Sequence, residues 1–198
     1  MFKNKTEKII YFILFGVMLF LFIYLGNKSY NGVEDNVLFA NEFKELDEYN
    51  VYKYAKARDI YLAMEKDLVV LFGFKSNKWT GYMASLLNSA AKKAKIDEVY
   101  YYDFLDDRGN NNGNYELIVN KLDGLVSVND RGKKELYAPA VLIIKDGKII
   151  YFDDETSFIK GDITPSAYWT KEKSDEKIKI MTDALREYRG VISGTEEE

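Results

Sequence analysis

The chain contains no cysteine and no histidine among its 198 residues. Without cysteine it forms no disulfide, thiolate nucleophile or iron–sulfur cluster, and without histidine it has no imidazole base and lacks the usual nitrogen ligand of transition metals. Thiol redox chemistry and Ser-His-Asp hydrolysis are therefore excluded. A composition of 47% hydrophobic and 30% charged residues, with no degenerate tract, is instead typical of a folded domain.

One long apolar run lies near the amino terminus, at residues 9–25 (IIYFILFGVMLFLFIYL). As a helix this uncharged run approaches the thickness of a bilayer core, so we expect an uncleaved, single-pass signal-anchor. A cleaved signal peptide is the alternative, but its apolar region is usually shorter and precedes a small-x-small site, which is missing here. Three lysines precede the run and one closely follows it. The positive-inside rule then places residues 1–8 in the cytoplasm and the C-terminal domain outside it, at the cell membrane.

The part beyond the expected anchor is acidic. Residues 29–198 retain 24 of the 28 basic and 31 of the 32 acidic side chains, which leaves a net charge of −7. Such a surface disfavours nucleic acid and anionic lipid as partners and tolerates a cationic peptide better. No cofactor is expected, since no residue pattern indicates one.

Composition and hydrophobic periodicity divide the rest of the chain into a linker with an amphipathic helix (26–50), a folded domain (51–190) and a tail (191–198). The apolar run at 67–74 is typical of a central strand buried on both faces. It is followed by a helix and a second strand, and two strands joined in this way should be parallel. An Asp-Gly pair between two β-rich runs predicts a hairpin. The expected helices cover residues 37–49, 55–66, 79–95, 115–122 and 171–188, and the expected strands cover residues 51–54, 67–74, 99–104, 140–144 and 148–152.

Two acidic segments are interpreted as solvated structure without a metal site. The segment at 106–114 (DDRGNNNGN) contains residue types of a calcium loop. Aligning Gly113 with the sixth position of such a loop, however, puts Arg108 at the first ligand position, so a surface turn is favoured. The run at 153–155 is interpreted as a solvated strand end rather than an acid–base pair, because neighbouring strand residues alternate faces.

Two further segments carry a resemblance to a known family. Residues 72–80 (FGFKSNKWT) follow a predicted strand and resemble a Phe-Gly-Phe-x-x-Cys-Pro-Trp-Cys motif, and residues 137–148 (YAPAVLIIKDGK) resemble a strand opened by a cis-proline before a hairpin with a Gly turn. Both segments are similar to those of small, often membrane-attached bacterial proteins of the thioredoxin-like superfamily, of the bacteriocin transport accessory type. The resemblance implies an α/β fold, with a thioredoxin-like mixed sheet flanked by helices, here preceded by one transmembrane helix.

The chain departs from that motif at the residues that carry its chemistry. Trp79 falls on the motif's Trp and Lys78 replaces its Pro, while Asn77 and Thr80 take the two Cys positions. Neither of these side chains can attack a disulfide, so the site is expected to be redox-inactive and no catalytic residue is assigned. Asn77 is instead suited to cap the following helix, since its side-chain oxygen accepts backbone N–H bonds.

A site of this kind without its thiols is expected to keep its binding surface. By the resemblance, an extended peptide would lie along Ala138 and Pro139, beside Trp79, through strand-like hydrogen bonds. The alternatives are that the ring of Trp79 packs onto its own domain and that Pro139 only locks the local conformation.

We therefore expect a membrane-anchored, redox-inactive domain outside the cytoplasm that binds or scaffolds a protein or peptide partner. The resemblance suggests an accessory of peptide export or of a cell-envelope complex. Two other functions stay open, namely a thioredoxin-fold enzyme with non-thiol chemistry and a structural membrane protein that forms homo-oligomers. The oligomeric state and the identity of the partner are not predicted.

Overall fold

The computed structural model of the chain describes residues 34–159 and 161–191. The expected cytoplasmic end (1–8) and the expected anchor (9–25) lie outside these residues, as does the tail from residue 192. Among the described residues, no helix is long and apolar enough to cross a bilayer.

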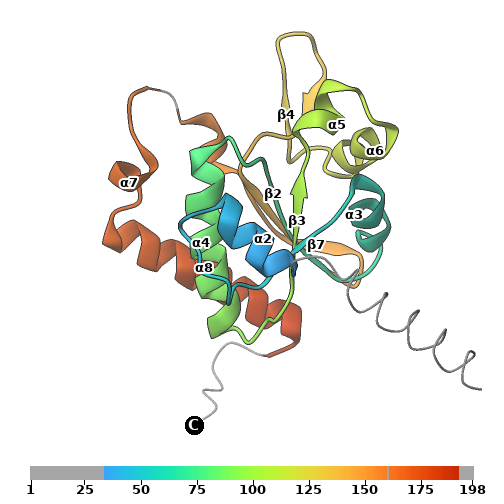
Figure 1. Cartoon of the computed structure of the whole chain (residues 1–198). Coiled ribbons are helices and arrows are strands. Elements are labelled where there is room, and N and C mark those ends of the chain that lie inside the picture. The colour runs from blue at the N-terminus through green and yellow to red at the C-terminus, as the bar shows by residue number, and fades with distance from the viewer. Residues whose placement is uncertain (1–33, 160, 192–198) are drawn as a thin grey trace, which may run out of the picture. The chain divides into compact units, whose positions relative to one another are not determined.

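A five-stranded mixed sheet forms the centre of the domain (Figure 1). Neighbouring strands follow the order β1-β3-β2-β6-β7, in which β1, β3 and β2 are parallel and β6 and β7 each run antiparallel to the strand before them. The parallel pairing of the second and third strands is thereby confirmed. The strands are β1 (Tyr52–Tyr54), β2 (Leu68–Gly73), β3 (Val99–Asp103), β6 (Ala140–Lys145) and β7 (Lys148–Asp153).

Helices cover both faces of this sheet (Figure 1). One face packs against α2 (Asp35–Glu42), α4 (Lys78–Lys93) and α8 (Lys171–Arg189), and the other packs against α3 (Ala57–Ala63) and α6 (Gly113–Lys121). Several short elements join the main ones: α5 (Leu105–Gly109), the hairpin of β4 (Ser127–Val128) and β5 (Lys134–Glu135), the 3-10 helix η1 (Glu155–Phe158) and α7 (Pro165–Tyr168).

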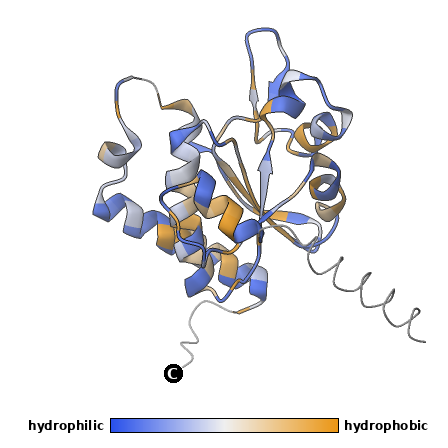
Figure 2. Ribbon diagram, in the orientation of Figure 1, coloured by the Kyte–Doolittle hydropathy of each residue, from blue (hydrophilic) through white to orange (hydrophobic). Residues whose placement is uncertain are grey.

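Strand β2 is buried along its whole length, as its apolar sequence predicts. Its side chains alternate between two cores: Val69 and Leu71 lie with α2, α4 and α8, whereas Val70 and Phe72 lie with α3 and α6. In Figure 2, the middle of the sheet is largely hydrophobic and the tip of the β4–β5 hairpin is hydrophilic. The sheet therefore separates two hydrophobic cores and holds both together.

The predicted β6–β7 hairpin is confirmed. Its turn residues Asp146 and Gly147 have φ values of 50° and 70°, and a turn with two positive φ angles matches the twist of the strands. The N–H of Gly147 also donates to the carbonyl of Lys66 (2.8 Å), which ties the turn to the chain just before β2.

The first helix is shorter than predicted. Instead of covering residues 37–49, it ends at Glu42. The chain then turns back, because Asn50 Nδ2 donates to the backbone oxygens of Asn36 (2.7 Å) and Asp47 (2.6 Å). The two buried phenylalanines of this region belong to the same core as α4 and α8, so α2 is part of the folded domain.

The sequence predicted a surface turn at residues 106–114, but the structure has helices at both ends of this segment. Its first half belongs to α5, and Gly113 begins α6. Asn112 caps α6, since its Oδ1 accepts from the backbone N–H groups of Asn114 (2.9 Å) and Tyr115 (3.4 Å).

The burial of β2 generates a test of stability. Leu71→Ala removes a fully buried side chain and is expected to lower the free energy of unfolding by about 3 kcal/mol, through lost burial and the cavity left behind. Denaturation in urea measures this loss. Leu117→Ala is the matched control, because Leu117 is 42% exposed on α6, and it should cost less than about 1 kcal/mol. Equal losses of unfolding free energy in the two variants would show that the buried side chains of β2 do not stabilise the core.

Candidate functional site

The side chain of Asn77 joins the start of α4 to the chain before β6. Its Oδ1 accepts from the backbone N–H of Trp79 (2.9 Å), so the predicted helix cap is confirmed. Its Nδ2 donates to the carbonyl oxygen of Ala138 (3.1 Å), a residue 61 positions further along the chain. Two segments that the resemblance places along one binding surface are therefore in direct contact.

The peptide bond between Ala138 and Pro139 is cis, and β6 begins at the next residue. Both residues are buried. The carbonyl oxygen of Pro139 accepts from the hydroxyl of Ser157 in η1 (2.7 Å). The chain after β7 thus returns to the proline, a contact that the sequence did not predict.

The ring of Trp79 is half-buried and packs on its own domain. Its edge meets the ring of Tyr168 in α7, with centroids 5.6 Å apart and planes at 71°. Tyr168 is itself held from two sides, by a hydrogen bond to Glu155 and by the ammonium of Lys173, 3.8 Å from the ring centroid. The packing role that was the alternative for Trp79 is thus observed, while part of the ring stays accessible.

The other two motif positions point in different directions. Lys78 is exposed. Thr80 is fully buried, and its Oγ1 has no hydrogen-bond partner among the described residues. It lies against the end of β2, where a Cβ added to Gly73 would be only 2.3 Å from the methyl carbon of Thr80. The absence of a side chain on Gly73 is what lets α4 begin so close to the sheet.

A surface hollow of about 540 Å³ lies beside the proline. Tyr137, the residue before Ala138, forms one part of its wall, and its ring centroid lies 5.0 Å from that of Phe158. Phe158 is 44% exposed, and Val128, which also lines the hollow, is 60% exposed. Neither the β4–β5 hairpin nor η1 was predicted from the sequence, so these lining residues were missed.

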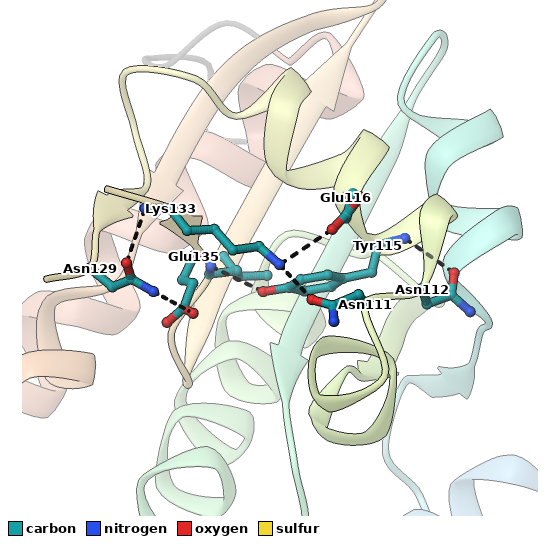
Figure 3. A network of polar contacts seen from close by, with 8 residues as sticks. Asn111, Asn112, Tyr115, Glu116, Asn129, Lys133 and Glu135 are labelled. Atoms are coloured by element: carbon teal, nitrogen blue, oxygen red, sulfur yellow. Dashed lines mark hydrogen bonds and ion pairs between the residues drawn. The ribbon is translucent and has the colours of Figure 1, made fainter. Parts of the chain in front are cut away.

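Hydrogen bonds hold the β4–β5 hairpin against α6 (Figure 3). The ammonium of Lys133 reaches Asn111 Oδ1 (2.7 Å) and the carboxylate of Glu116 (3.3 Å). Below them, the hydroxyl of buried Tyr115 accepts from the backbone N–H of Leu136 (3.3 Å). Burial raises the pKa of Tyr115, so this phenol stays neutral at physiological pH. The chain that leads from the hairpin to the proline is therefore anchored at its start.

The interpretation of residues 153–155 as a solvated strand end is wrong for Asp153. Its side chain is only 6% exposed and binds the ammonium of Lys177 on α8 (2.6 Å) and the hydroxyl of Tyr151 (2.7 Å). Lys177 also pairs with Glu155 (2.7 Å), the first residue of η1. One lysine thus fastens the end of β7 and the start of η1 to α8, and its partner lies 24 residues away, where no local pattern could reveal it.

The ion pair shifts the pKa values of both buried partners. Burial raises the pKa of Asp153, but the hydrogen bonds from Lys177, the Glu155 amide and Tyr151 outweigh burial, so the pKa is lowered. Burial lowers the pKa of Lys177, but its hydrogen bonds to Asp153 and Glu155 outweigh burial, so the pKa is raised. Both groups stay charged at neutral pH.

The arrangement offers contacts rather than a reactive group. The absence of cysteine fits a protein without thiol–disulfide activity. In residues 34–159 and 161–191, no cluster of three or more acidic side chains is placed to hold a metal ion. What the site does present is a partly accessible Trp ring, the backbone beside a cis-proline and an adjoining hollow. No protein-family model matches the chain, and a comparison with curated proteins found no match.

Replacing Lys177 should destabilise the fold. Lys177→Met keeps most of the side-chain volume but leaves Asp153 buried without its cation. The free energy of unfolding at pH 7, measured in urea, is expected to fall by about 3 kcal/mol. Lys179→Met is the control, because Lys179 is exposed on the same helix and forms no ion pair with a described residue. It should change the stability by less than about 0.5 kcal/mol.

The stability that Lys177→Met loses relative to the natural chain should depend on pH. The lowered pKa of Asp153 means that its contribution is present at neutral pH and is lost as the pH falls through that pKa. The raised pKa of Lys177 means that its contribution is also present at neutral pH and is lost only as the pH rises through that pKa. The penalty of Lys177→Met should therefore shrink below about pH 4. A penalty that is the same at about pH 3 as at neutral pH would contradict the assigned pair.

Proposed function

We propose that this chain is a redox-inactive, thioredoxin-like domain that binds an extended peptide or a protein segment at the junction of α4 and β6. Three features support the relationship: the strand order β1-β3-β2-β6-β7, the cis-proline that leads into β6 and the helix start placed beside it. The proposal includes a membrane anchor at residues 9–25 and a domain outside the cytoplasm, on the grounds of hydropathy and flanking charge.

The contact between Asn77 and Ala138 is the observation that carries the proposal. In a dithiol relative, a reactive Cys would stand at the position of Asn77, where the helix N-terminus stabilises its thiolate. Asn77 keeps the helix cap and the approach to the proline, but supplies no nucleophile. The geometry of a substrate-handling site is therefore combined with a side chain that can only hold and position.

A bound peptide has a free backbone donor available at this junction. The carbonyl of Ala138 already accepts from Asn77, whereas the N–H of Ala138 donates to none of the described residues. An extended peptide that places a carbonyl opposite this N–H would add to the chain before Pro139 in the manner of a further strand. The accessible part of Trp79 and the hollow beside Tyr137 would receive side chains on either side.

Site-specific crosslinking in intact cells tests this function. A photoreactive phenylalanine derivative at position 79 is expected to form an adduct with one defined partner, because the ring lies at the proposed peptide path. The matched control carries the same group at Tyr49, an aromatic residue that is 76% exposed. The backbone N–H of Val51, two residues after Tyr49, donates to Asn88 Oδ1 (3.2 Å). Asn88 lies roughly 15 Å along α4 from the first residue of that helix, so Tyr49 lies away from the site.

Equal adducts at both positions would contradict a specific groove. Adducts whose mass is a multiple of the chain itself would favour the homo-oligomeric alternative instead. Adducts with lipid alone would indicate that position 79 faces a membrane, which also contradicts the proposal.

Restoring the thiols tests the proposed relationship by a separate route. The double variant Asn77→Cys/Thr80→Cys places one sulfur at the helix N-terminus and one at the buried position three residues later. It is expected to catalyse the reduction of insulin by dithiothreitol, whereas the natural chain does not. The single variants are the controls, since one thiol alone cannot complete the exchange. A double variant no faster than the single ones would count against the thioredoxin-like assignment.

A further inference from the structure

Arg108, in the last turn of α5, is a half-buried cation held by aromatic rings. Its guanidinium carbon lies 5.3 Å from the ring centroid of Phe104 and 5.9 Å from that of Phe74. Stacking of this kind restrains the planar group and leaves its N–H edges available for other bonds.

Contacts on two sides place Arg108 at the proposed peptide-binding junction. One guanidinium nitrogen donates to the carbonyl of Leu136 (3.3 Å), two residues before Ala138. On the other side, the carbonyl of Phe74 accepts from the backbone N–H of Asn77 (3.0 Å). The guanidinium therefore borders both chain segments that Asn77 brings together.

Arg108 forms no ion pair with a carboxylate of the described residues. Three other half-buried cations have a carboxylate partner: Lys121 with Glu65, Lys134 with Asp123 and Lys177 with Asp153. Lys145, which is also half-buried, donates instead to the backbone carbonyl of Glu187 (2.6 Å).

The acidic groups nearest to Arg108 in the sequence do not serve it either. Asp107 accepts from the hydroxyl of Tyr102 (2.6 Å) and Asp106 is exposed. Arg108 is thus one of two half-buried cations among the described residues that lack a counter-ion, although the part of the chain beyond residue 28 carries a net charge of −7.

We propose that Arg108 binds a carboxylate of the peptide that occupies the junction. A guanidinium carries five N–H donors, of which the Leu136 carbonyl uses one, and the remaining edge matches a carboxylate in a two-pronged pair. Arg108 alone can pair with one carboxylate of a ligand. A polyanion would be repelled by the negative charge of the surrounding domain. This inference rests on the proposed function and specifies the chemistry of its ligand.

Selection from a random peptide library tests the proposal with the full chain in detergent micelles. Two formats separate the two sources of a carboxylate: peptides fused at their C-terminal end present only side-chain carboxylates, and peptides with a free C-terminus present both. A selected peptide is then synthesised with its carboxylate intact and neutralised, as Glu→Gln or as the C-terminal amide. Dissociation constants are measured by fluorescence anisotropy.

Neutralising the peptide carboxylate is expected to weaken binding to the natural chain by about tenfold. Arg108→Gln should weaken binding of the intact peptide by a similar factor and should make the two peptide forms bind alike. Arg108→Lys keeps the charge without the planar fork and should give an intermediate loss. Arg58→Gln is the control with the same change in charge, because Arg58 is exposed on α3 without an ion pair to a described residue, and it should bind as the natural chain does.

The outcomes separate this inference from the proposed function. Peptides that are selected and bind at position 79, but whose affinity does not depend on a carboxylate, overturn the role of Arg108 and leave peptide binding intact. No selected peptide, together with no specific crosslink from position 79, overturns both. If Arg108→Gln loses its near-ultraviolet circular dichroism, and so its tertiary packing, Arg108→Lys decides the matter: full discrimination against the neutral peptide excludes a two-pronged pair.

Discussion

The site depends on one side-chain amide. Asn77 accepts a hydrogen bond from the first turn of α4 and donates another to the carbonyl of Ala138, so one group fixes a helix start against a distant strand start. An aspartate could cap the helix but could not donate to the carbonyl, and the single hydroxyl of a serine has less reach to do both. The amide therefore suits this position on physical grounds that involve no chemistry of bond breaking.

Around this contact, the helices on the two faces of the sheet place chemically different side chains. From the side of α4 and α8 come aromatic edges, with Trp79 against Tyr168, held in place by Glu155 and Lys173. From the side of α5 and α6 comes a cation, Arg108, between aromatic faces. The junction is thus bordered by apolar area on one side and by positive charge on the other. A ligand that satisfies both sides would have a preferred direction along the chain.

The main elements could be predicted from the sequence because each carries its own local signal. A continuous apolar run marks β2, an Asp-Gly turn marks the β6–β7 hairpin, and apolar spacings of three and four mark α8. The short elements carry no such signal, since η1 and the β4–β5 hairpin are stabilised by distant partners such as the carbonyl of Pro139 and the hydroxyl of Tyr115. In the site, the cap of Asn77 was predictable because it is local, whereas its bond to Ala138 was not. The burial of Asp153 escaped prediction for the same reason, because Lys177 belongs to a different element.

The close packing of Gly73 under Thr80 couples two positions that differ in secondary structure. Since a Cβ at position 73 would be 2.3 Å from the Thr80 methyl carbon, a side chain fits at position 73 only when the residue at position 80 is made smaller. Gly73 itself cannot be made smaller, so it leaves no room for a larger residue at position 80. The last residue of the central strand thereby limits the volume of the side chain that the first turn of α4 can place against the sheet.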